Sequence, residues 1–305
     1  MREKMSILDE EVLKRYESAG RILAETREEL RRFVKVGMPI IEICEKAEAL
    51  IREKGAHPAF PCNVSVNEIA AHYTSPLDDE KTIPANSIVK IDLGAHIDGY
   101  LTDTAITLCF NPKYESMVRT AEEALKKAIE TIHAGMFVSK LGAIIEEAIT
   151  SRGFKPVSNL TGHLIGRYQV HAGKSLPNVA HLSLSKIKVG EVYAIEPFVT
   201  LPSAVGKVRN GKEAHIFRFI KKKSVKSSLA KRLLEYIQKT FYTLPFTERW
   251  LKKFTVEESY EKAFKELISS RSVMKYPVFV EVSRKPVAQA EHTVLILEDS
   301  CQVLT

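Results

Sequence analysis

Residues 89–110 read VKIDLGAHIDGYLTDTAITLCF and predict a β-hairpin. Two runs rich in β-branched residues flank a short turn-forming segment at residues 96–99, the pattern of two antiparallel strands joined by a tight loop. If the turn centres between Ile97 and Asp98, residues whose numbers sum to 195 face each other. Asp92 and Asp103 form such a pair. Because directly opposed side chains project to the same face with Cβ atoms roughly 5 Å apart, the sequence predicts two neighbouring carboxylates.

Two carboxylates at this separation repel each other when both are ionised, so either one of them binds a proton or cations neutralise the pair. A proton-sharing pair is one interpretation, and a pair of divalent metals is the other. Three more ligand-type side chains on strand-like segments, His163, Glu196 and Glu291, favour the metals. One imidazole and four carboxylates suit Mn, Fe, Co or Zn in a catalytic two-metal site better than a closed thiolate site does. Two metals that share a water lower its pKa and polarise a carbonyl, which is hydrolytic chemistry at an amide or ester.

A pattern of helix, Gly-Met, helix and Gly occurs twice in the chain. The spacing of apolar residues predicts helices over residues 9–36, 39–54, 114–133 and 139–152. Gly37 and Gly135 are 98 residues apart, and the same interval separates Gly55 from Gly153. The spacing indicates either a duplicated half-domain or a chance likeness of two amphipathic helix pairs.

The strand-like segments that follow the two copies favour duplication. The segments SIVKIDLG and EVYAIEPF place Asp92 and Glu196 at the same point. The segments TDTAITL and AEHTVLI do the same for Asp103 and Glu291. Since three successive features agree, we expect a duplicated half-domain with a site where the halves meet.

The composition is that of an ordinary globular protein. The 305 residues are 45% apolar and 27% charged, which excludes global disorder, and their number allows two domains or one large one. The net charge of +7 does not by itself indicate a nucleic-acid binder. Four cysteines without a C-x-x-C pair argue against a zinc knuckle and for a reduced, intracellular protein. Residues 1–20 lack the apolar core of a secretory signal, and no run of about 18 apolar residues occurs, so we expect a soluble cytoplasmic protein with no membrane partner.

A segment of different character, residues 221–275, separates the second and third matching features. It begins KKKSVKSSLAKRLLEYIQKTF and is amphipathic, basic and helical in pattern. We interpret it as an inserted helical subdomain, with residues 1–220 and 276–305 forming the catalytic domain. Its positive charge either forms a solvated face or docks on RNA or another anionic surface.

Five motifs, which follow one another along the chain from Phe60 onward, resemble those of the type 2 methionine aminopeptidases in the short form without a long N-terminal extension. The motifs are FPCNVSVNEIAAHYTSP, VKIDLGAHIDGYLTDTAIT, SNLTGHLIGRYQVHAGKSLPN, AIEPF and AEHTVLI. The resemblance implies the α+β pita-bread fold of creatinases and aminopeptidases, in which two pseudo-symmetric halves form a curved antiparallel sheet backed by helices. Residues 221–275 match the insertion that distinguishes type 2 enzymes.

The resemblance also implies a site for two divalent metal ions. By this likeness, Asp103 and Glu291 would bridge both metals, and Asp92 would chelate one. His163 and Glu196 would hold the other, and Glu196 would also act as general base on the bridging water. The physiological metal is left open among Co, Mn, Fe and Zn.

Further matching residues are expected to contact the substrate. His72 would approach the scissile amide or the leaving group, and His171 would donate a hydrogen bond to the carbonyl oxygen as negative charge builds on it. The residues that match the methionine pocket of the family are Phe60, Val170, Phe198, Tyr276 and His215. One departure from the family pattern is Thr161, where relatives often have Asn, and it bears on substrate contacts rather than on the chemistry.

The implied function is removal of the N-terminal methionine from nascent polypeptides, by attack of a water or hydroxide that bridges the two metals. A small second residue would fit the site, whereas a large one would clash. We expect a monomer, with association of the basic segment with the ribosome left open.

Two alternatives to this function are an Xaa-Pro peptidase of the same fold and a non-catalytic pita-bread protein that binds RNA or ribosomes. The inserted helices and the placement of the AAHYT and GH…HAG motifs argue against the first. The second would be expected to have lost ligands, whereas all five are present.

Overall fold

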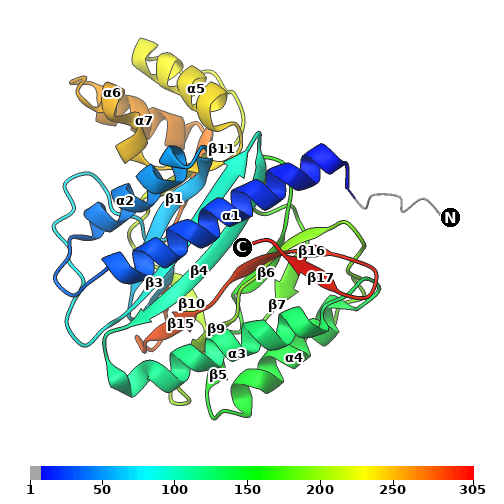
Figure 1. Cartoon of the computed structure of the whole chain (residues 1–305). Helices are drawn as coiled ribbons and strands as arrows, with labels where there is room; N and C mark the ends of the chain where they lie inside the picture. The colour runs from blue at the N-terminus through cyan, green and yellow to red at the C-terminus, as the bar shows by residue number, and fades with distance from the viewer. Residues whose placement is uncertain (1–7) are drawn as a thin grey trace.

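The computed structural model describes residues 8–305 and has an α+β architecture (Figure 1). The first seven residues, on which the expectation about a secretory signal partly rests, lie outside the described residues. The helices of this range are α1 (Glu10–Phe33), α2 (Ile40–Glu53), α3 (Glu115–Thr131), α4 (Val138–Thr150), α5 (Ser228–Phe241), α6 (Lys252–Thr255) and α7 (Tyr260–Ser269), with 3-10 helices η1 (Pro112–Tyr114) and η2 (Glu248–Leu251). None of them is long and apolar enough to cross a membrane.

The strands pair antiparallel throughout the described residues and form five sheets. The sheet of the first half has the order β1 (His57–Val66), β3 (Ile88–Ile97), β4 (Tyr100–Cys109). The largest sheet of the second half has the order β17 (Cys301–Val303), β16 (His292–Ile296), β8 (Val192–Ile195), β6 (Thr161–Ile165), β7 (Ser175–Pro177). The three smaller sheets are β15 (Val287–Gln289), β9 (Phe198–Thr200), β5 (Lys155–Pro156); β10 (Val208–Asn210), β14 (Phe279–Glu281), β2 (Ile69–Ala71); and β12 (Pro245–Phe246), β11 (Ile216–Phe219), β13 (Val273–Tyr276).

The hairpin β3–β4 forms, but its turn lies one residue further along the chain than predicted. Ile97 pairs with Tyr100, so the loop consists of Asp98 and Gly99. Both loop residues have positive φ, +51° and +84°. A two-residue loop with positive φ at both positions is a type I′ turn, for which Asp-Gly is a favoured sequence.

This turn changes the pairing of the two acids. Asp92 lies opposite Ala105 rather than Asp103, and Asp103 lies opposite Gly94. The predicted direct pair is therefore wrong. Because the register differs from the prediction by two residues, the acids become diagonal neighbours and still project to the same face.

A pair of helices covers each half of the sheet structure (Figure 1). Helix α1 packs on β3 and β4, and α2 packs on β1, whereas α3 packs on β8, β9 and β15 and α4 on β5 and β7. Asp9 caps α1, since its Oδ1 accepts hydrogen bonds from the backbone N–H groups of Glu11 and Val12 at 2.9 and 3.4 Å. Helix α1 ends at Phe33 rather than at residue 36, and Pro39 is the N-cap of α2 rather than its first residue.

The two helix pairs make the same backbone contact with the segments that precede β3 and β8. The backbone N–H of Gly37 donates to Ile83 O at 2.8 Å, and that of Gly135 donates to Ile187 O at 2.8 Å. The φ angles of the two glycines are +85° and +83°. A Cβ at either position would meet no atom within 4 Å, so the left-handed backbone rather than lack of space favours glycine here. The interval seen in the sequence therefore corresponds to a repeated structure.

Helices α5, α6 and α7 lie together at one end of the molecule (Figure 1). They surround an apolar cluster of their own, which includes Leu233, Phe246 and Phe264. Phe217 of β11 and Val273 of β13 complete this cluster from the strands on either side. That residues 221–275 form a separate subdomain stays a proposal.

Candidate metal centre

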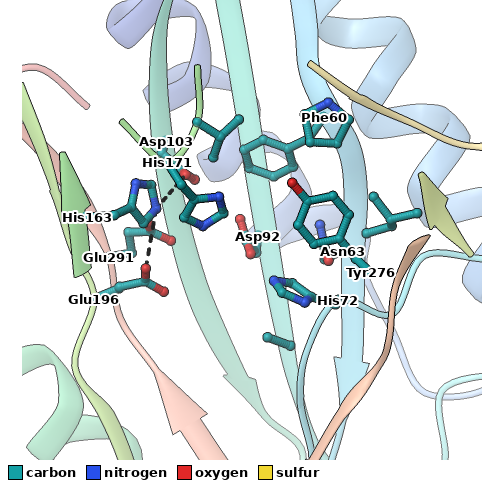
Figure 2. A pocket seen from close by; sticks show the side chains of 14 residues that line it. Phe60, Asn63, His72, Asp92, Asp103, His163, His171, Glu196, Tyr276 and Glu291 are labelled. Carbon is teal, nitrogen blue, oxygen red and sulfur yellow. Dashed lines mark ion pairs between the residues drawn. The ribbon is translucent and has the colours of Figure 1, made fainter. Parts of the chain in front are cut away.

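Three antiparallel segments place carboxylates on one face where the halves meet. Asp92 of β3 lies opposite Ala105 of β4, and Ala105 forms a bridge with Glu291, which directly precedes β16. Two backbone hydrogen bonds, of 3.4 and 3.1 Å, join Ala105 and Glu291. Asp103 lies two residues from Ala105 on the same strand, so its side chain points to the same face. Figure 2 shows Asp92, Asp103 and Glu291 projecting into one space.

A threonine of the second half holds the backbone of Asp103. The N–H of Asp103 donates to Thr293 Oγ1 at 2.7 Å, and this hydroxyl donates to the carbonyl oxygen of Asp103 at 2.7 Å. One side chain thus satisfies both backbone groups of Asp103. The carboxylate of Asp103 remains available to the site.

Strands β6 and β8 add an imidazole and a fourth carboxylate. His163 of β6 pairs with Ala194 of β8, and Glu196 follows one residue after β8 ends. His163 Nε2 lies 3.4 Å from Glu196 Oε1 and 3.7 Å from Asp103 Oδ2, as the dashed lines in Figure 2 mark. Asp103, His163 and Glu291 each offer a ligand atom within 4.8 Å of the other two. The structure brings all five side chains predicted as ligands into the lining of one cavity.

Burial raises the pKa values of the four carboxyl groups, and repulsion from neighbouring carboxylates adds to this for three of them. Burial raises the pKa of Asp92 from 3.8 to about 7. Burial is also the largest cause that raises the pKa values of Asp103, Glu196 and Glu291 well above their usual range, and neighbouring carboxylates raise them further. The pKa of His163 is lowered well below 6.5, mainly by burial. A cation would favour the ionised carboxylates and would accept the lone pair of the neutral imidazole.

Unpaired oxygen atoms also fit a cation. Among residues 8–305, Asp92 Oδ1 and Asp103 Oδ1 are buried and have no hydrogen-bond partner. A buried carboxylate oxygen without a partner costs free energy unless a proton or a cation neutralises it. The residues therefore fit a divalent metal of the kind that binds mixed nitrogen and oxygen ligands.

Two further histidines line the same cavity. The ring of His171 lies 4.3 Å from that of His163, centroid to centroid, and the ring of His72 lies 4.5 Å from that of Phe279. Burial lowers the pKa of His72 and of His171 to about 4. Both imidazoles are therefore neutral at pH 7, and each has one N–H donor and one acceptor nitrogen.

Apolar and aromatic side chains form most of the rest of the cavity. Phe60, Val170 and Tyr276, three of the residues expected to line a methionine pocket, are among the lining residues. Ile216 and Pro245 add to the same wall, and the sequence pattern did not single them out. A cavity in which an apolar wall lies beside a few convergent polar groups is typical of small-ligand sites.

Phe198 and His215 are not among the residues that line the cavity. Phe198 is 1% exposed and belongs to an apolar cluster that includes Ala71 and Val287. The ring of His215 lies 5.7 Å from that of Tyr73, centroid to centroid. Neither residue thus belongs to the lining expected for it. Ala71, which shares the apolar cluster of Phe198, and Ile216, which follows His215, do line the cavity.

Gln289 is a site residue that the sequence analysis missed. Its Nε2 donates to Glu196 Oε2 at 3.4 Å and to Glu291 Oε2 at 3.3 Å, and the side chain is buried. It therefore orients two carboxylates predicted as ligands. Because side chains two apart on a strand share a face, its position two residues before Glu291 was a usable signal.

Asn63 is a second missed residue of the cavity lining. It lies opposite Asp92 in the pairing of β1 with β3, beyond an irregularity in that register. Its Nδ2 donates to Pro61 O at 2.9 Å, and its Oδ1 is buried without a partner among the described residues. Nothing in the spacing of the motif distinguishes this Asn from an ordinary strand residue.

Comparisons with known proteins agree on one family. Residues 14–229 match metallopeptidase family M24. The chain is 43% identical over 297 residues to a methionine aminopeptidase of Methanothermobacter thermautotrophicus, a match that covers 96% of this chain and 99% of that protein.

Solved structures match the fold at lower identity. A methionine aminopeptidase of Thermotoga maritima has a TM-score of 0.71 and 22% identity, and the match covers 98% of each chain. A thermophilic Arx1 has a TM-score of 0.80 and 20% identity, over 97% of this chain and 91% of that one. The predicted pita-bread fold is confirmed.

Proposed function

The chain belongs to metallopeptidase family M24 and, within it, to the archaeal-type (type 2) methionine aminopeptidases, and from this membership we propose that its substrates are nascent polypeptides with a small second residue. One observation carries the proposal. Ligand-type side chains from both halves of the fold, Asp92, Asp103, His163, Glu196 and Glu291, line one cavity that also has an apolar wall. Such a cavity offers hydrolytic chemistry beside a pocket for an uncharged side chain.

The five side chains are proposed to hold two divalent cations. Asp103 and Glu291 would contact both, and Asp92 would contact one. His163 and Glu196, which lie 3.4 Å apart, would hold the other. Family membership supports a divalent metal, whereas the number of ions and their identity among Mn, Fe, Co and Zn belong to the proposal. When bound, such cations lower the pKa of a water and polarise the scissile carbonyl.

Glu196 is the proposed general base. Its two oxygens lie near His163 Nε2 and Gln289 Nε2, each at 3.4 Å, so the carboxylate has a defined orientation. It accepts a proton from the attacking water and returns it to the leaving amine. His171 donates its N–H to the carbonyl oxygen as negative charge develops there, and His72 contacts the scissile amide or the leaving group.

The apolar wall is the proposed methionine pocket. Phe60, Val170 and Tyr276 would contact the methionine side chain, together with Ile216 and Pro245. Selection at the second residue would be steric, because a small side chain fits beside the scissile bond and a large one collides with the cavity wall.

The test compares release of methionine from Met-Ala-Ser and Met-Leu-Ser by chelator-treated protein after addition of Mn²⁺, Co²⁺ or Fe²⁺. We expect metal-dependent release from the first peptide and at least about tenfold slower release from the second. An Xaa-Pro dipeptide in the same assay should remain intact. Release of methionine that does not depend on metal would contradict the site assignment, and cleavage of the Xaa-Pro dipeptide alone would contradict the substrate assignment.

Location and partners are part of the proposal as well. We place the protein in the cytoplasm, because methionine removal acts on polypeptides as they are made. We also propose that it is a monomer. Residues 221–275 would form a subdomain whose basic face could contact the ribosome; in this reading the charge of Lys221, Lys222 and Lys223 faces an anionic surface. Sedimentation of the protein with ribosomes at low and high salt tests that contact, and size-exclusion chromatography tests the monomer.

A further inference from the structure

A buried ion pair joins the inserted segment to the first half of the fold. Glu48 of α2 and Arg249 of η2 are 2% and 3% exposed. The guanidinium binds the carboxylate in a two-pronged arrangement, with Nη1–Oε2 and Nη2–Oε1 distances of 3.0 and 2.7 Å. The Trp250 Nε1–H and the backbone N–H of Cys62 also donate to this carboxylate, at 2.7 and 3.2 Å. The carboxylate therefore holds Arg249 in one orientation.

The donors of Arg249 also bind a second partner, the segment that follows His72. Arg249 Nε donates to the carbonyl oxygen of Ser75 at 2.7 Å, and its Nη2 also lies 3.1 Å from Thr74 Oγ1. Thr74 and Ser75 are both fully buried. The planar guanidinium thus links α2 to a loop that begins at the cavity wall.

The position of His72 depends on its backbone and on ring contacts with Tyr276 and Phe279, at centroid distances of 5.6 and 4.5 Å. Its φ of +66° lies in the left-handed region, which costs free energy for a residue with a Cβ. Its Nδ1 is buried and has no hydrogen-bond partner among residues 8–305. On one side of it Ala71 pairs with Phe279, and on the other the carbonyl oxygen of Tyr73 accepts from the N–H of Val64 at 2.7 Å. Beyond these contacts, Arg249 binds Thr74 and Ser75, and Asp79 accepts hydrogen bonds from the hydroxyls of Tyr73 and Ser75.

We propose that Arg249, oriented by Glu48, is a positioning residue that holds the 72–75 loop so that the ring of His72 faces the scissile amide. The inference rests on the proposed role of His72. It also assigns a task to the inserted segment, since Pro245, four residues before Arg249, lines the same cavity. The insertion would thereby support the site through two residues four positions apart, Pro245 at the cavity wall and Arg249 behind the loop.

A charged pair suits this task better than an apolar contact. Replacing a buried ion pair by apolar residues of similar volume is often neutral for stability or even stabilising, so stability alone does not account for it. The fork of an arginine specifies direction, and here it bonds a carboxylate, a hydroxyl and a carbonyl at once. The expected consequence of losing it is a misplaced imidazole in a folded protein.

The experiment uses the full chain loaded with Mn²⁺ and the substrate Met-Ala-Ser. The main variant is Glu48→Leu/Arg249→Met, which removes both charges together and leaves no unpaired buried ion. The second variant is Arg249→Lys, which keeps the positive charge but lacks the fork. The matched control is Trp250→Phe, which removes one donor to Glu48 without a bond to residues 72–75. The double variant and Arg249→Lys are also made in a His72→Ala background.

We expect the double variant and Arg249→Lys to lose about tenfold or more in kcat, with a smaller change in KM, because misplacement by about 1 Å is costly to catalysis. Trp250→Phe should stay within about twofold of the parent. In the His72→Ala background the same substitutions should change kcat by less than about twofold, since the group they position is gone. Circular dichroism and the thermal midpoint identify any variant that fails to fold, and Arg249→Lys then carries the test.

An equal loss of kcat with and without His72 would overturn the proposal, because it would show that Arg249 acts on the fold in general. An unchanged kcat in the folded variants would overturn it as well. Failure of the proposed role of His72 is a separate result, since His72→Ala alone would then retain the activity of the parent. Failure of the proposed function is distinguished from both, because the Mn²⁺-loaded parent itself would then release no methionine from Met-Ala-Ser.

Discussion

The two halves of the duplication supply different parts of one site. The first half contributes Asp92 and Asp103 from β3 and β4, which are 10 residues long each and paired along their whole length. The second half contributes His163, Glu196 and Glu291 from or beside β6, β8 and β16, of 5, 4 and 5 residues. Glu196 and Glu291 lie just outside their strands. The first half thus presents its two acids on long, fully paired strands, whereas the second half presents Glu196, the proposed general base, and Glu291 beside short ones.

Among the substitutions considered, Asp103→Ala is expected to have the greatest effect on metal binding and activity. This change removes the first-half carboxylate whose Oδ2 lies 3.7 Å from Nε2 of His163 in the second half, so the proposed site loses one cation ligand. We expect divalent-metal affinity to fall by more than about 100-fold, since even partners of ligands are worth 10–100-fold, and methionine release to fall below detection. Calorimetric titration with Mn²⁺ measures the first effect. Retention of stoichiometric tight metal would contradict the assignment of Asp103 as a shared ligand.

Glu196→Gln separates chemistry from metal binding in the second half. The amide keeps the size of the carboxylate and one oxygen, but it does not accept a proton at neutral pH. We expect kcat to fall by roughly 10²–10⁴-fold, with the thermal midpoint close to that of the parent and metal still bound. Metal content and circular dichroism of the same sample are the controls. A variant with near-parental kcat would exclude Glu196 as the base.

His171→Ala tests a group of the second half that is neither a proposed metal ligand nor the proposed base. Loss of the N–H donor to the carbonyl oxygen should lower kcat by about 10²-fold, with little change in metal affinity. Replacement by Gln, which retains an N–H donor, should restore part of the loss. If Ala and Gln variants are equally active, hydrogen bonding by this side chain is not its contribution.

The smallest expected effect is on stability in the metal-free protein. Burial raises the pKa of Asp92 from 3.8 to about 7, so the native state holds a proton that the unfolded chain releases near pH 4. The stabilisation of the native state by this proton is fully present below about pH 4 and is lost as the pH rises towards 7. We expect this group to lower the free energy of unfolding of the parent by roughly 2–4 kcal/mol between about pH 4 and pH 7, an effect that a variant without the carboxyl group lacks.

Asp92→Asn provides the reference for this titration, because Asn has a similar size and binds no proton. The difference in urea-unfolding free energy between parent and variant, measured in EDTA from pH 4 to pH 8, isolates the group. Saturating Mn²⁺ should remove the pH dependence of the parent, since the cation replaces the proton. A difference that does not change with pH would show that Asp92 ionises normally.

The sequence predicted the elements that depend on local pattern. The Asp-Gly pair required a tight turn, and the strands on either side of it were recognisable from their composition. The turn was placed one residue too early because the φ angles that Asp98 and Gly99 adopt determine which residues pair. The acids kept a common face because a pairing shift of two residues preserves the period of a strand.

The parts that the sequence did not predict depend on distant packing. Glu48 and Arg249 are 201 positions apart, and no local pattern connects them. The left-handed backbone of His72 lies between Ala71, which pairs with the distant Phe279, and Tyr73, whose carbonyl oxygen accepts from Val64. Phe198 and His215 are not among the residues that line the cavity, although Glu196 and Ile216, which lie near them in the chain, are. Orientation, unlike position in the chain, is decided by the surrounding structure.

The most direct test of the whole account is a titration of one metal-free preparation with Mn²⁺, in which bound metal and the rate of methionine release from Met-Ala-Ser are measured together. If side chains of both halves form a single catalytic metal site, the rate should rise with metal occupancy in the parent, whereas Glu196→Gln should bind the metal and stay inactive. A parent that releases methionine at its full rate before any metal is bound would contradict the account.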